Sequence, residues 1–282
     1  MDYFKNRLSR FFCLFKLIII LGDMMQTILI TGAASGLAKN VIDKIKDNEY
    51  FIFLTVRTDK QLERVKEKYK NYKNIKCLKL DITNKQDLDK VKELDIDILI
   101  NNAAIGEGGS VLTIPIKRLE KNFDTNVFGT VALTQIVLQK MLQKDSGKII
   151  NIASLAGVMP ISFLGSYSAT KASIIKLSIV LRNELKLLTD NIKIVLIEPG
   201  FYHTGFNQVM LENKYNDYRT YFDDCIELIK ARENLMLRLL EHKSFNSITD
   251  KTIKAIKLDN PHFIYRAPFW QSIGSKIYEL FH

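Results

Sequence analysis

The sequence predicts an α/β fold: a doubly wound parallel sheet in a single domain, completed by a helical C-terminal cap. From residue 27 onward, short β-rich runs alternate with longer helical patterns. Most of the runs are continuously apolar, as is typical of parallel strands covered by helices on both faces. No polar linker divides the chain. Together these observations imply successive βαβ units with right-handed crossovers.

Six runs are candidate strands, at residues 27–31, 50–56, 75–80, 96–101, 147–152 and 192–198. The helical patterns between them lie at residues 36–46, 60–69, 86–91, 116–143 and 167–187. After Gly200 the rhythm changes. There we expect helices at about 218–240, 248–257 and 270–281, with a short extended piece between Pro261 and Pro268. Residues 25–282 are therefore expected to form one domain, with a substrate cap from about residue 201.

The composition limits the kinds of ligand and partner that the protein is expected to bind. The net charge of +10 comes from 41 Lys and Arg against 31 Asp and Glu, but the lysines are scattered and no basic block is interleaved with aromatics. This pattern disfavours nucleic-acid binding. Cys13, Cys77 and Cys225 are far apart and support neither a disulfide framework nor a zinc site. We expect a cytoplasmic protein without a metal.

Residues 1–24 stand apart from the predicted fold. Basic residues precede an apolar run at residues 11–21, which is shorter than the ~18–20 residues needed to span a bilayer. No small-residue cleavage site follows it. Two interpretations stay open: an extension that is dispensable to a domain beginning near Met25, or an interfacial anchor that places residues 1–21 on a membrane surface.

The first candidate strand runs into TGAASGLA at residues 31–38, which opens a helix. Glycines at such a junction allow a tight turn and let a pyrophosphate approach the helix N-terminus, where free amides and the helix dipole favour anions. Arg57 follows the second strand, where the adenine ribose of a dinucleotide would lie, and a guanidinium accommodates a 2′-phosphate. The pattern predicts a Rossmann-like fold that binds NADP, with NAD as the other possibility. An ordinary solvated loop arginine is the alternative for Arg57.

Three further residues suggest acid–base chemistry. Tyr167 and Lys171 are four apart in a predicted helix and share a face, and an ammonium close to a phenol lowers its pKa. A tyrosine tuned in this way donates a proton to a developing alkoxide and takes it back in reverse. Ser154 lies at the end of the fifth strand, on the edge where open α/β sheets bind ligands. The combination predicts hydride transfer between a nicotinamide and a carbonyl or secondary alcohol.

These motifs resemble those of the short-chain dehydrogenase/reductase family over residues 27–204. The family's TGxxxGxG matches residues 31–38, NNAG matches 101–104, and PGxxxT matches 199–204. Its Ser, Tyr and Lys match the three residues above, and its helical Asn matches Asn126. Residues 264–270 bear a weaker likeness to steroid- and retinol-dehydrogenase-like members.

The resemblance implies a role for each residue. Tyr167 would be the catalytic acid/base, Lys171 would lower its pKa and hold the nicotinamide ribose, Ser154 would orient the substrate oxygen, and Asn126 would hold a relay water. The implied cofactor-binding residues are Gly32, Ser35, Gly36, Leu37, Arg57, Asp81, Ile82, Asn102, Tyr167, Lys171, Pro199 and Thr204.

Three positions depart from the family pattern. Ala38 and Ala104 replace glycines. The methyl group of Ala38 is expected to shift the helix slightly. The side chain of Ala104 is expected to disfavour a left-handed backbone at that position. Ser35 is not the basic residue that many NADP-preferring members carry there.

The segments that should form the pocket are apolar, with Met159, Ile161, Phe163, Leu164, Phe201, Phe206 and Met210. They favour an apolar carbonyl or alcohol, such as a lipid-like, steroid-like or aliphatic ketone. A non-catalytic NADP-binding redox sensor is the alternative, and the four filled catalytic positions argue against it. Resemblance to the family's paired-helix dimers implies a homo-oligomer through residues 116–143 and 167–187. The apolar side chains expected on these helices are Val127, Val131, Leu138, Ile174, Leu177 and Leu181.

Overall fold

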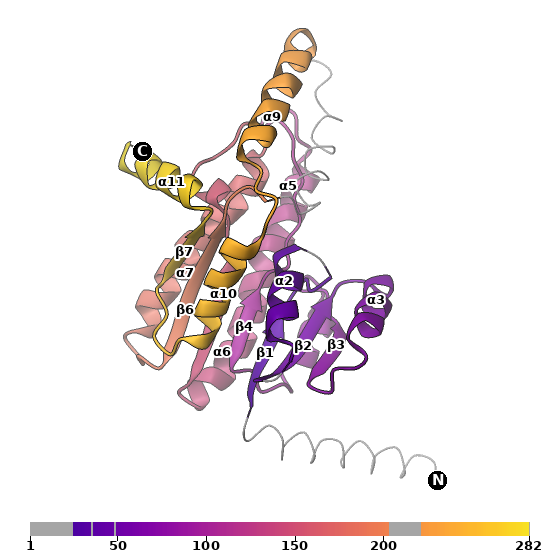
Figure 1. The fold of residues 1–282 in the computed structure, drawn as a ribbon, viewed down its shortest axis with the longest axis vertical. Coiled ribbons are helices and arrows are strands. Elements are labelled where there is room, and N and C mark those ends of the chain that lie inside the picture. The colour runs from indigo at the N-terminus through magenta and orange to yellow at the C-terminus, as the bar shows by residue number, and fades with distance from the viewer. Residues whose placement is uncertain (1–24, 35, 48, 203–220, 282) are drawn as a thin grey trace.

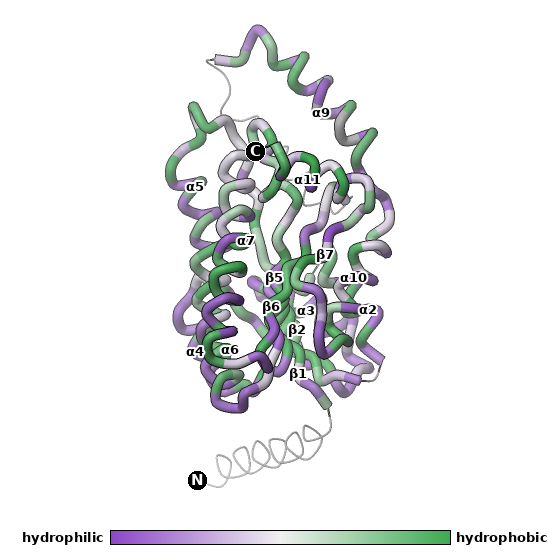
Figure 2. The backbone as a smooth tube through the Cα atoms, turned by 90° about the vertical axis from the view of Figure 1, so that its left-hand side faces the viewer, coloured by the Kyte–Doolittle hydropathy of each residue, from purple (hydrophilic) through white to green (hydrophobic). Residues whose placement is uncertain are grey.

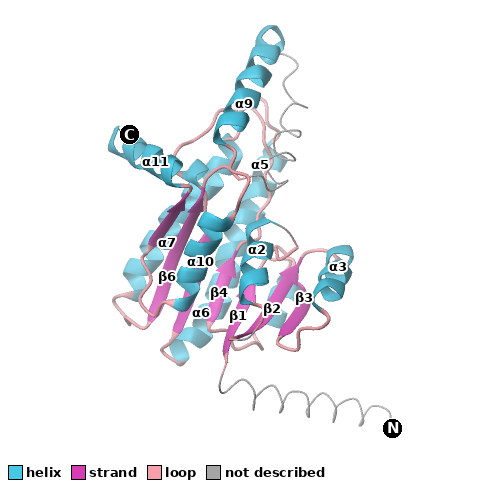
Figure 3. Cartoon of the chain, in the orientation of Figure 1, coloured by secondary structure: helices cyan, strands magenta, loops and turns pink. Residues whose placement is uncertain are grey.

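The computed structural model describes residues 25–34, 36–47, 49–202 and 221–281, and these form a seven-stranded parallel sheet between layers of helices (Figures 1 and 3). The strand order is β3-β2-β1-β4-β5-β6-β7. The strands are β1 (Gln26–Ile30), β2 (Tyr50–Val56), β3 (Ile75–Lys79), β4 (Ile98–Asn101), β5 (Gly147–Ile152), β6 (Ile192–Pro199) and β7 (Ile264–Ala267). The order reverses between β1 and β4, so the crevice expected at such a switch point opens at their carboxyl ends.

Helices cover both faces of this sheet. One face carries α2 (Gly36–Ile45), α3 (Asp59–Tyr69) and α10 (Asn246–Lys257). The other carries α4 (Lys85–Val91), α6 (Thr130–Gln143) and α7 (Gly165–Leu185). The other α-helices of the described residues are α5 (Ile116–Phe123), α9 (Ile226–Leu240) and α11 (Phe269–Phe281). The predicted fold class is confirmed: a doubly wound parallel sheet in a single domain with C-terminal helices.

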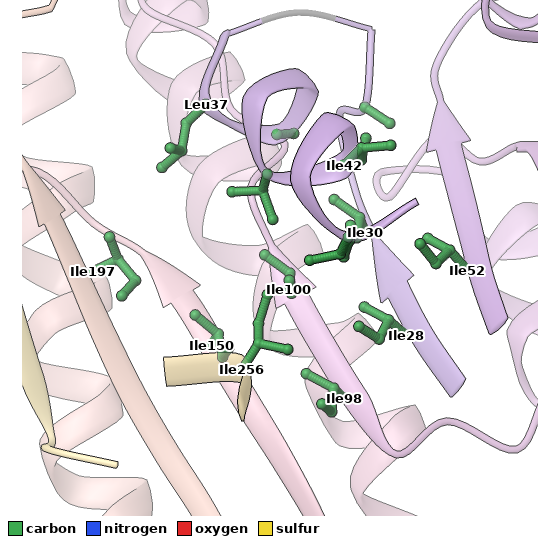
Figure 4. Packing of buried hydrophobic residues seen from close by; sticks show 14 of the residues in the cluster. Ile28, Ile30, Leu37, Ile42, Ile52, Ile98, Ile100, Ile150, Ile197 and Ile256 are labelled. Atoms are coloured by element: carbon green, nitrogen blue, oxygen red, sulfur yellow. The ribbon is translucent and has the colours of Figure 1, made fainter. Parts of the chain in front are cut away.

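The core explains why the strands read as continuous apolar runs. Successive side chains of a strand point to opposite faces of the sheet. Ile28 and Ile30 of β1 join the cluster under α2 and α10 (Figure 4), whereas Leu29 joins the cluster under α6. All three side chains are fully buried. Because both faces are covered at these three positions, all three residues are apolar.

The predicted helix at 116–143 is not continuous. A π-helical turn, Asp124–Gly129, separates α5 from α6. Single π turns inside helices are frequently found at functional sites, and this one carries Asn126. Its side chain bonds to the backbone of Ile105 and to Thr170 of α7. The apolar pattern runs through the turn unbroken, so the sequence alone did not reveal it.

The outer faces of the same helices differ from the expectation for an oligomer. Val127, Leu138 and Ile174 are at most 7% exposed and belong to the core, so the prediction that they form an interface is wrong. The apolar side chains that do face outward include Phe128 and Leu177.

The C-terminal region is less of a cap than expected. β7 pairs in parallel with β6 and extends the sheet, and α10 packs against α2. Of the C-terminal helices that the structure describes, α9 and α11 lie beyond the carboxyl ends of the strands (Figure 1). In the part of the chain that the structure describes, no helix is both long and apolar enough to cross a bilayer. The predictions for residues 1–24 lie outside the described residues.

Candidate active site

A cavity of about 290 Å³ opens at the carboxyl ends of the strands. It is lined from the β1–α2 turn, the ends of β2 and β5, the loops after β3 and β4, and the start of α10. Most of the predicted site residues meet there: Gly32, Gly36, Leu37, Arg57, Asp81, Ile82, Asn102, Ser154, Tyr167, Lys171 and Pro199. Ser35 and Thr204 lie outside the described residues.

The β1–α2 turn forms a cradle for an anion. Gly32 and Gly36 have φ of +66° and +62°, the left-handed region that favours glycine. A Cβ at Gly32 would lie 2.9 Å from the Cα of Ala103, whereas one at Gly36 would meet nothing within 4 Å. The space at the start of α2 is therefore open, and the first turn of that helix carries no acidic residue. Free amides and the helix dipole at this point suit the pyrophosphate of a dinucleotide.

Thr31 holds this turn against the loop after β4. Its hydroxyl accepts hydrogen bonds from the backbone N–H groups of Asn102 and Ala103, both at 3.0 Å. In return, the Asn102 amide donates to the carbonyls of Thr31 and Gly32, at 3.0 and 3.2 Å. Sequence reasoning noted Thr31 only as the first letter of the glycine motif and missed its role.

The two alanines that replace family glycines cause no strain. In the described part of the chain, the non-glycine residues with positive φ are Asp145 and Phe163, so Ala104 has an ordinary backbone. The expected conflict there is wrong. Ala38 is 2% exposed, and its methyl group packs within the core under α2.

Two arginines, one at the end of β2 and one on α3, lie near this cavity or its glycine-rich turn. Arg57 lines the cavity at the end of β2, just before Thr58 caps α3 by accepting from the N–H of Gln61 at 3.3 Å. Arg64 of α3 reaches across and donates to the carbonyl of Ala34 in the glycine-rich turn, at 2.7 Å. Sequence reasoning missed Arg64, because the contact joins residues thirty apart.

The three reactive residues come together where β5 ends and α7 begins. Ser154 follows β5, and its Oγ accepts from the N–H of Ala156 at 3.1 Å and hydrogen-bonds with the Tyr167 hydroxyl. Lys171 lies one turn beyond Tyr167, with its Nζ 5.7 Å from the centre of the phenol ring. That Nζ donates to the carbonyl of Ile152 at 2.8 Å.

The pKa of Tyr167 moves opposite to the expectation. Burial raises the pKa of Tyr167 to about 12, and the hydrogen bond from Ser154 opposes this only in part. Burial lowers the pKa of Lys171 to about 8. Desolvation of the phenol is the largest effect on the pKa of Tyr167, so the net shift is upward even with Lys171 one helical turn away. Tyr167 therefore keeps its proton at neutral pH, which suits donation to a carbonyl oxygen.

Asn126 acts from behind the cavity. Its Oδ1 accepts from the N–H of Ile105 at 2.8 Å, and its Nδ2 donates to the carbonyl of Ile105 at 2.8 Å and to the Thr170 hydroxyl at 3.1 Å. Thr170 lies between Tyr167 and Lys171 on α7, so these bonds fix the helix turn that carries both. The relay water expected at Asn126 stays a prediction.

The substrate side of the cavity is mainly apolar. Of the residues predicted there, Ile161, Leu164 and Phe201 line it, Met159 and Phe163 do not, and Phe206 and Met210 lie outside the described residues. The lining residues that sequence reasoning missed include Tyr202, Phe245 and Ile248. The rings of Tyr202 and Phe245 are stacked, with centroids 5.2 Å apart.

Comparison with known proteins agrees with this geometry. Residues 26–214 match the family model described as short chain dehydrogenase. The chain is 32% identical to a 3-ketodihydrosphingosine reductase of Bacteroides thetaiotaomicron, over 74% of this chain and 77% of that protein. It is 33% identical to an NADPH-dependent 3-dehydrocapnine reductase of Ornithobacterium rhinotracheale, over 62% and 65% respectively. The fold is similar to that of a serine dehydrogenase complexed with NADP⁺, with a TM-score of 0.72 and 24% identity over 86% of this chain and 94% of that one.

The fold and the site define a nicotinamide-dependent oxidoreductase that interconverts carbonyl and hydroxyl groups. The chain belongs to the short-chain dehydrogenase family. The redox-sensor alternative is not favoured, because the reactive residues are in place and the relatives are reductases. Among the described residues, no group of three or more His, Cys, Asp or Glu side chains could hold a metal ion.

Proposed function

We propose that the protein is an NADPH-dependent reductase of a ketone on a lipid-like or aliphatic substrate. The observation that carries the proposal is the hydroxyl of Tyr167, bonded to Ser154, in a cavity that is also lined by apolar and aromatic side chains. Relatives named for 3-ketodihydrosphingosine and 3-dehydrocapnine support the same class of substrate.

In this direction each residue has one task. A bound nicotinamide supplies the hydride. Tyr167 donates its proton to the ketone oxygen, and Ser154 hydrogen-bonds the same oxygen as its negative charge develops. The ammonium of Lys171 stabilises the tyrosinate left behind. The hydrogen bonds of Asn126 keep α7 in register with the loop after β4.

Two guanidinium groups support NADP over NAD. Arg57 lines the adenosine end of the cavity, and Arg64 is bonded to the adjacent glycine-rich turn. Neither pairs with a carboxylate among the residues that the structure describes. A 2′-phosphate would supply the missing anion and accept charge-assisted hydrogen bonds. Arg64 would bring from α3 the positive charge that the turn lacks at Ser35.

The direct test is reduction of 3-ketodihydrosphingosine, followed by the loss of absorbance of the reduced nicotinamide, with a sugar ketone as the polar comparison. Wild-type enzyme should reduce the long-chain ketone with NADPH. Tyr167→Phe should lose ~10²–10⁴-fold in rate and still bind NADPH, because only the proton donor is gone. Faster turnover of the sugar ketone would contradict the substrate class. A near-normal rate in Tyr167→Phe would mean that another group is the acid.

We also propose a homo-oligomer built on the outward faces of the π-helical turn and α7. Phe128 is 61% exposed and Leu177 is 44% exposed. Sedimentation of wild type against Phe128→Glu/Leu177→Glu tests this proposal: the substituted chain should become monomeric. A monomeric wild type at micromolar concentration would contradict it.

A further inference from the structure

The C-terminal helix α11 has its polarity inverted for a surface helix. Several of its polar side chains bond to the rest of the protein, whereas Lys276 is exposed. The Gln271 amide accepts from the N–H of Phe201 at 2.8 Å and donates to the carbonyl of Leu240 at 2.7 Å. Glu279 binds the Arg266 guanidinium through two bonds, at 2.7 and 2.8 Å, and Ser275 is fully buried. A helix on water normally buries its apolar stripe and exposes its polar one.

The apolar side chains of α11 face away from the protein. The outward set is Phe269, Trp270, Ile277, Leu280 and Phe281, which are between 51% and 81% exposed. At 3.6 residues per turn they fall within an arc of about 120°. Figure 2 shows this helix largely in hydrophobic colours. A contiguous aromatic and aliphatic face of this kind marks an interaction surface.

A second apolar stripe lies on α9. Leu228, Leu235 and Leu239 are 72%, 58% and 74% exposed, and spacings of seven and four residues place them on one side of the helix. Arg232 and Arg238 of the same helix are also exposed. We call these three leucines and the outward set of α11 the docking face.

The docking face adjoins the mouth of the active site. Both helices lie beyond the carboxyl ends of the strands, at the end where the cavity opens (Figures 1 and 3). Gln271 ties them together, because it bonds both the last residue of α9 and Phe201, which lines the cavity.

We propose that the docking face seats the enzyme on the surface of a lipid bilayer that contains anionic lipid, with the cavity mouth toward the membrane. The inference rests on the proposed function, since a lipid-like ketone would be dissolved there. Three of the five outward residues of α11 are aromatic, and tryptophan prefers the boundary between acyl chains and headgroups. The amphipathic pattern is that of a helix lying in the interface, and the net charge of +10 is attracted to anionic headgroups.

A second copy of the chain is a poorer occupant. The two helices diverge as they leave the body of the protein (Figure 1), so their apolar stripes form two separate ridges. A two-fold contact between copies needs one self-complementary patch on each.

The chain carries its own reporter, because Trp270 is the one tryptophan in the sequence. With full-length protein and vesicles of phosphatidylcholine and phosphatidylglycerol, we expect a blue shift of the emission and quenching by lipids brominated on their acyl chains. Leu280→Ala/Phe281→Ala keeps the tryptophan and should lower the partition coefficient at least about tenfold. The matched control is Leu187→Ala/Leu188→Ala, which removes exposed leucines that follow α7 at the opposite end of the sheet and should bind like wild type.

The outcomes separate clearly. A blue shift without bromolipid quenching, accompanied by dimers that Leu280→Ala/Phe281→Ala abolishes, would assign the face to a second copy and overturn the proposal. Unchanged vesicle binding by that variant would also overturn it. Reduction of a short, water-soluble ketone should be the same in all three proteins. If the wild-type enzyme does not reduce that ketone at all, the result would count against the proposed function and not against the membrane proposal.

Discussion

Removing the charge of Lys171 is the sharpest test of the catalytic geometry. Its Nζ lies 5.7 Å from the centre of the Tyr167 ring. At an effective dielectric constant of ~20, unit charges at that distance interact with about 3 kcal/mol, which corresponds to roughly a hundredfold in rate. Lys171→Met keeps the length of the side chain and removes its charge. We therefore expect kcat/KM for ketone reduction at pH 7 to fall about a hundredfold.

The pH dependence of the reduction rate also tests the role of the Lys171 charge. Because burial lowers the pKa of Lys171 to about 8, the ammonium is present below that pH and is lost as pH rises through it. The phenol of Tyr167, with a pKa of about 12, stays protonated throughout. Reduction by wild type should be level up to about pH 8 and then decline toward the lower rate of Lys171→Met. The variant should show no inflection there.

The measurement is the initial rate of ketone reduction between pH 6 and 10 for wild type and Lys171→Met. The control is Lys176→Met, which removes the charge of an exposed lysine on the same helix. A second readout is stability. Between pH 8 and 10.5 the unfolded chain binds the Lys171 proton and the folded chain does not, so the unfolding free energy of wild type should rise by up to about 3 kcal/mol more than that of Lys171→Met. A variant that keeps the decline above pH 8, or that loses only a few-fold in rate, would refute the reasoning.

Three further predictions concern other parts of the chain. Arg57→Ala and Arg64→Ala should each weaken NADPH roughly 10- to 150-fold and leave NADH nearly unchanged, by fluorescence titration; equal losses for both nucleotides would make them ordinary surface arginines. A chain beginning at Met25 should keep its melting temperature and cofactor binding, and an insoluble product would show that residues 1–24 are needed for folding. Arg266→Met should cost about 3–5 kcal/mol in urea unfolding, because it leaves the fully buried Glu198 carboxylate without its 2.5 Å partner. Adding Glu198→Gln should recover much of that loss, and no recovery would mean that Arg266 stabilises the fold in another way.

The strands of the parallel sheet and the helices between them were predictable because each has its own pattern of apolar residues in the sequence. The bounds of β2 and β5 agree with the prediction, and β2 in particular is a nearly continuous apolar run that ends at Arg57. The pairing of β7 with β6 was not foreseen. A four-residue strand has too short a pattern to show which neighbour it joins.

In the site too, features with a local sequence signal were predictable and features that depend on tertiary packing were not. Tyr167, Lys171 and Ser154 were placed correctly, because spacing along a helix and position after a strand are local properties. The direction of the Tyr167 pKa shift depends on how deeply the ring is buried, which is a property of packing. The bond from Arg64 to Ala34 joins an ordinary surface helix to the glycine-rich turn, and nothing near Arg64 in the sequence marks it.

The place of α10 and β7 has a consequence for synthesis on the ribosome. Lys44 of α2 pairs with Asp250 of α10, although 206 residues separate them in sequence. The first βαβ units therefore leave the ribosome long before α10, the helix that covers them. The edge of β6 stays unpaired until β7 has been synthesised. Until residue 267 has left the exit tunnel, the nascent chain exposes apolar surface on α2 and unpaired backbone groups on β6. Exposed apolar surface and an unpaired strand edge make such a nascent chain prone to aggregation until these elements have packed.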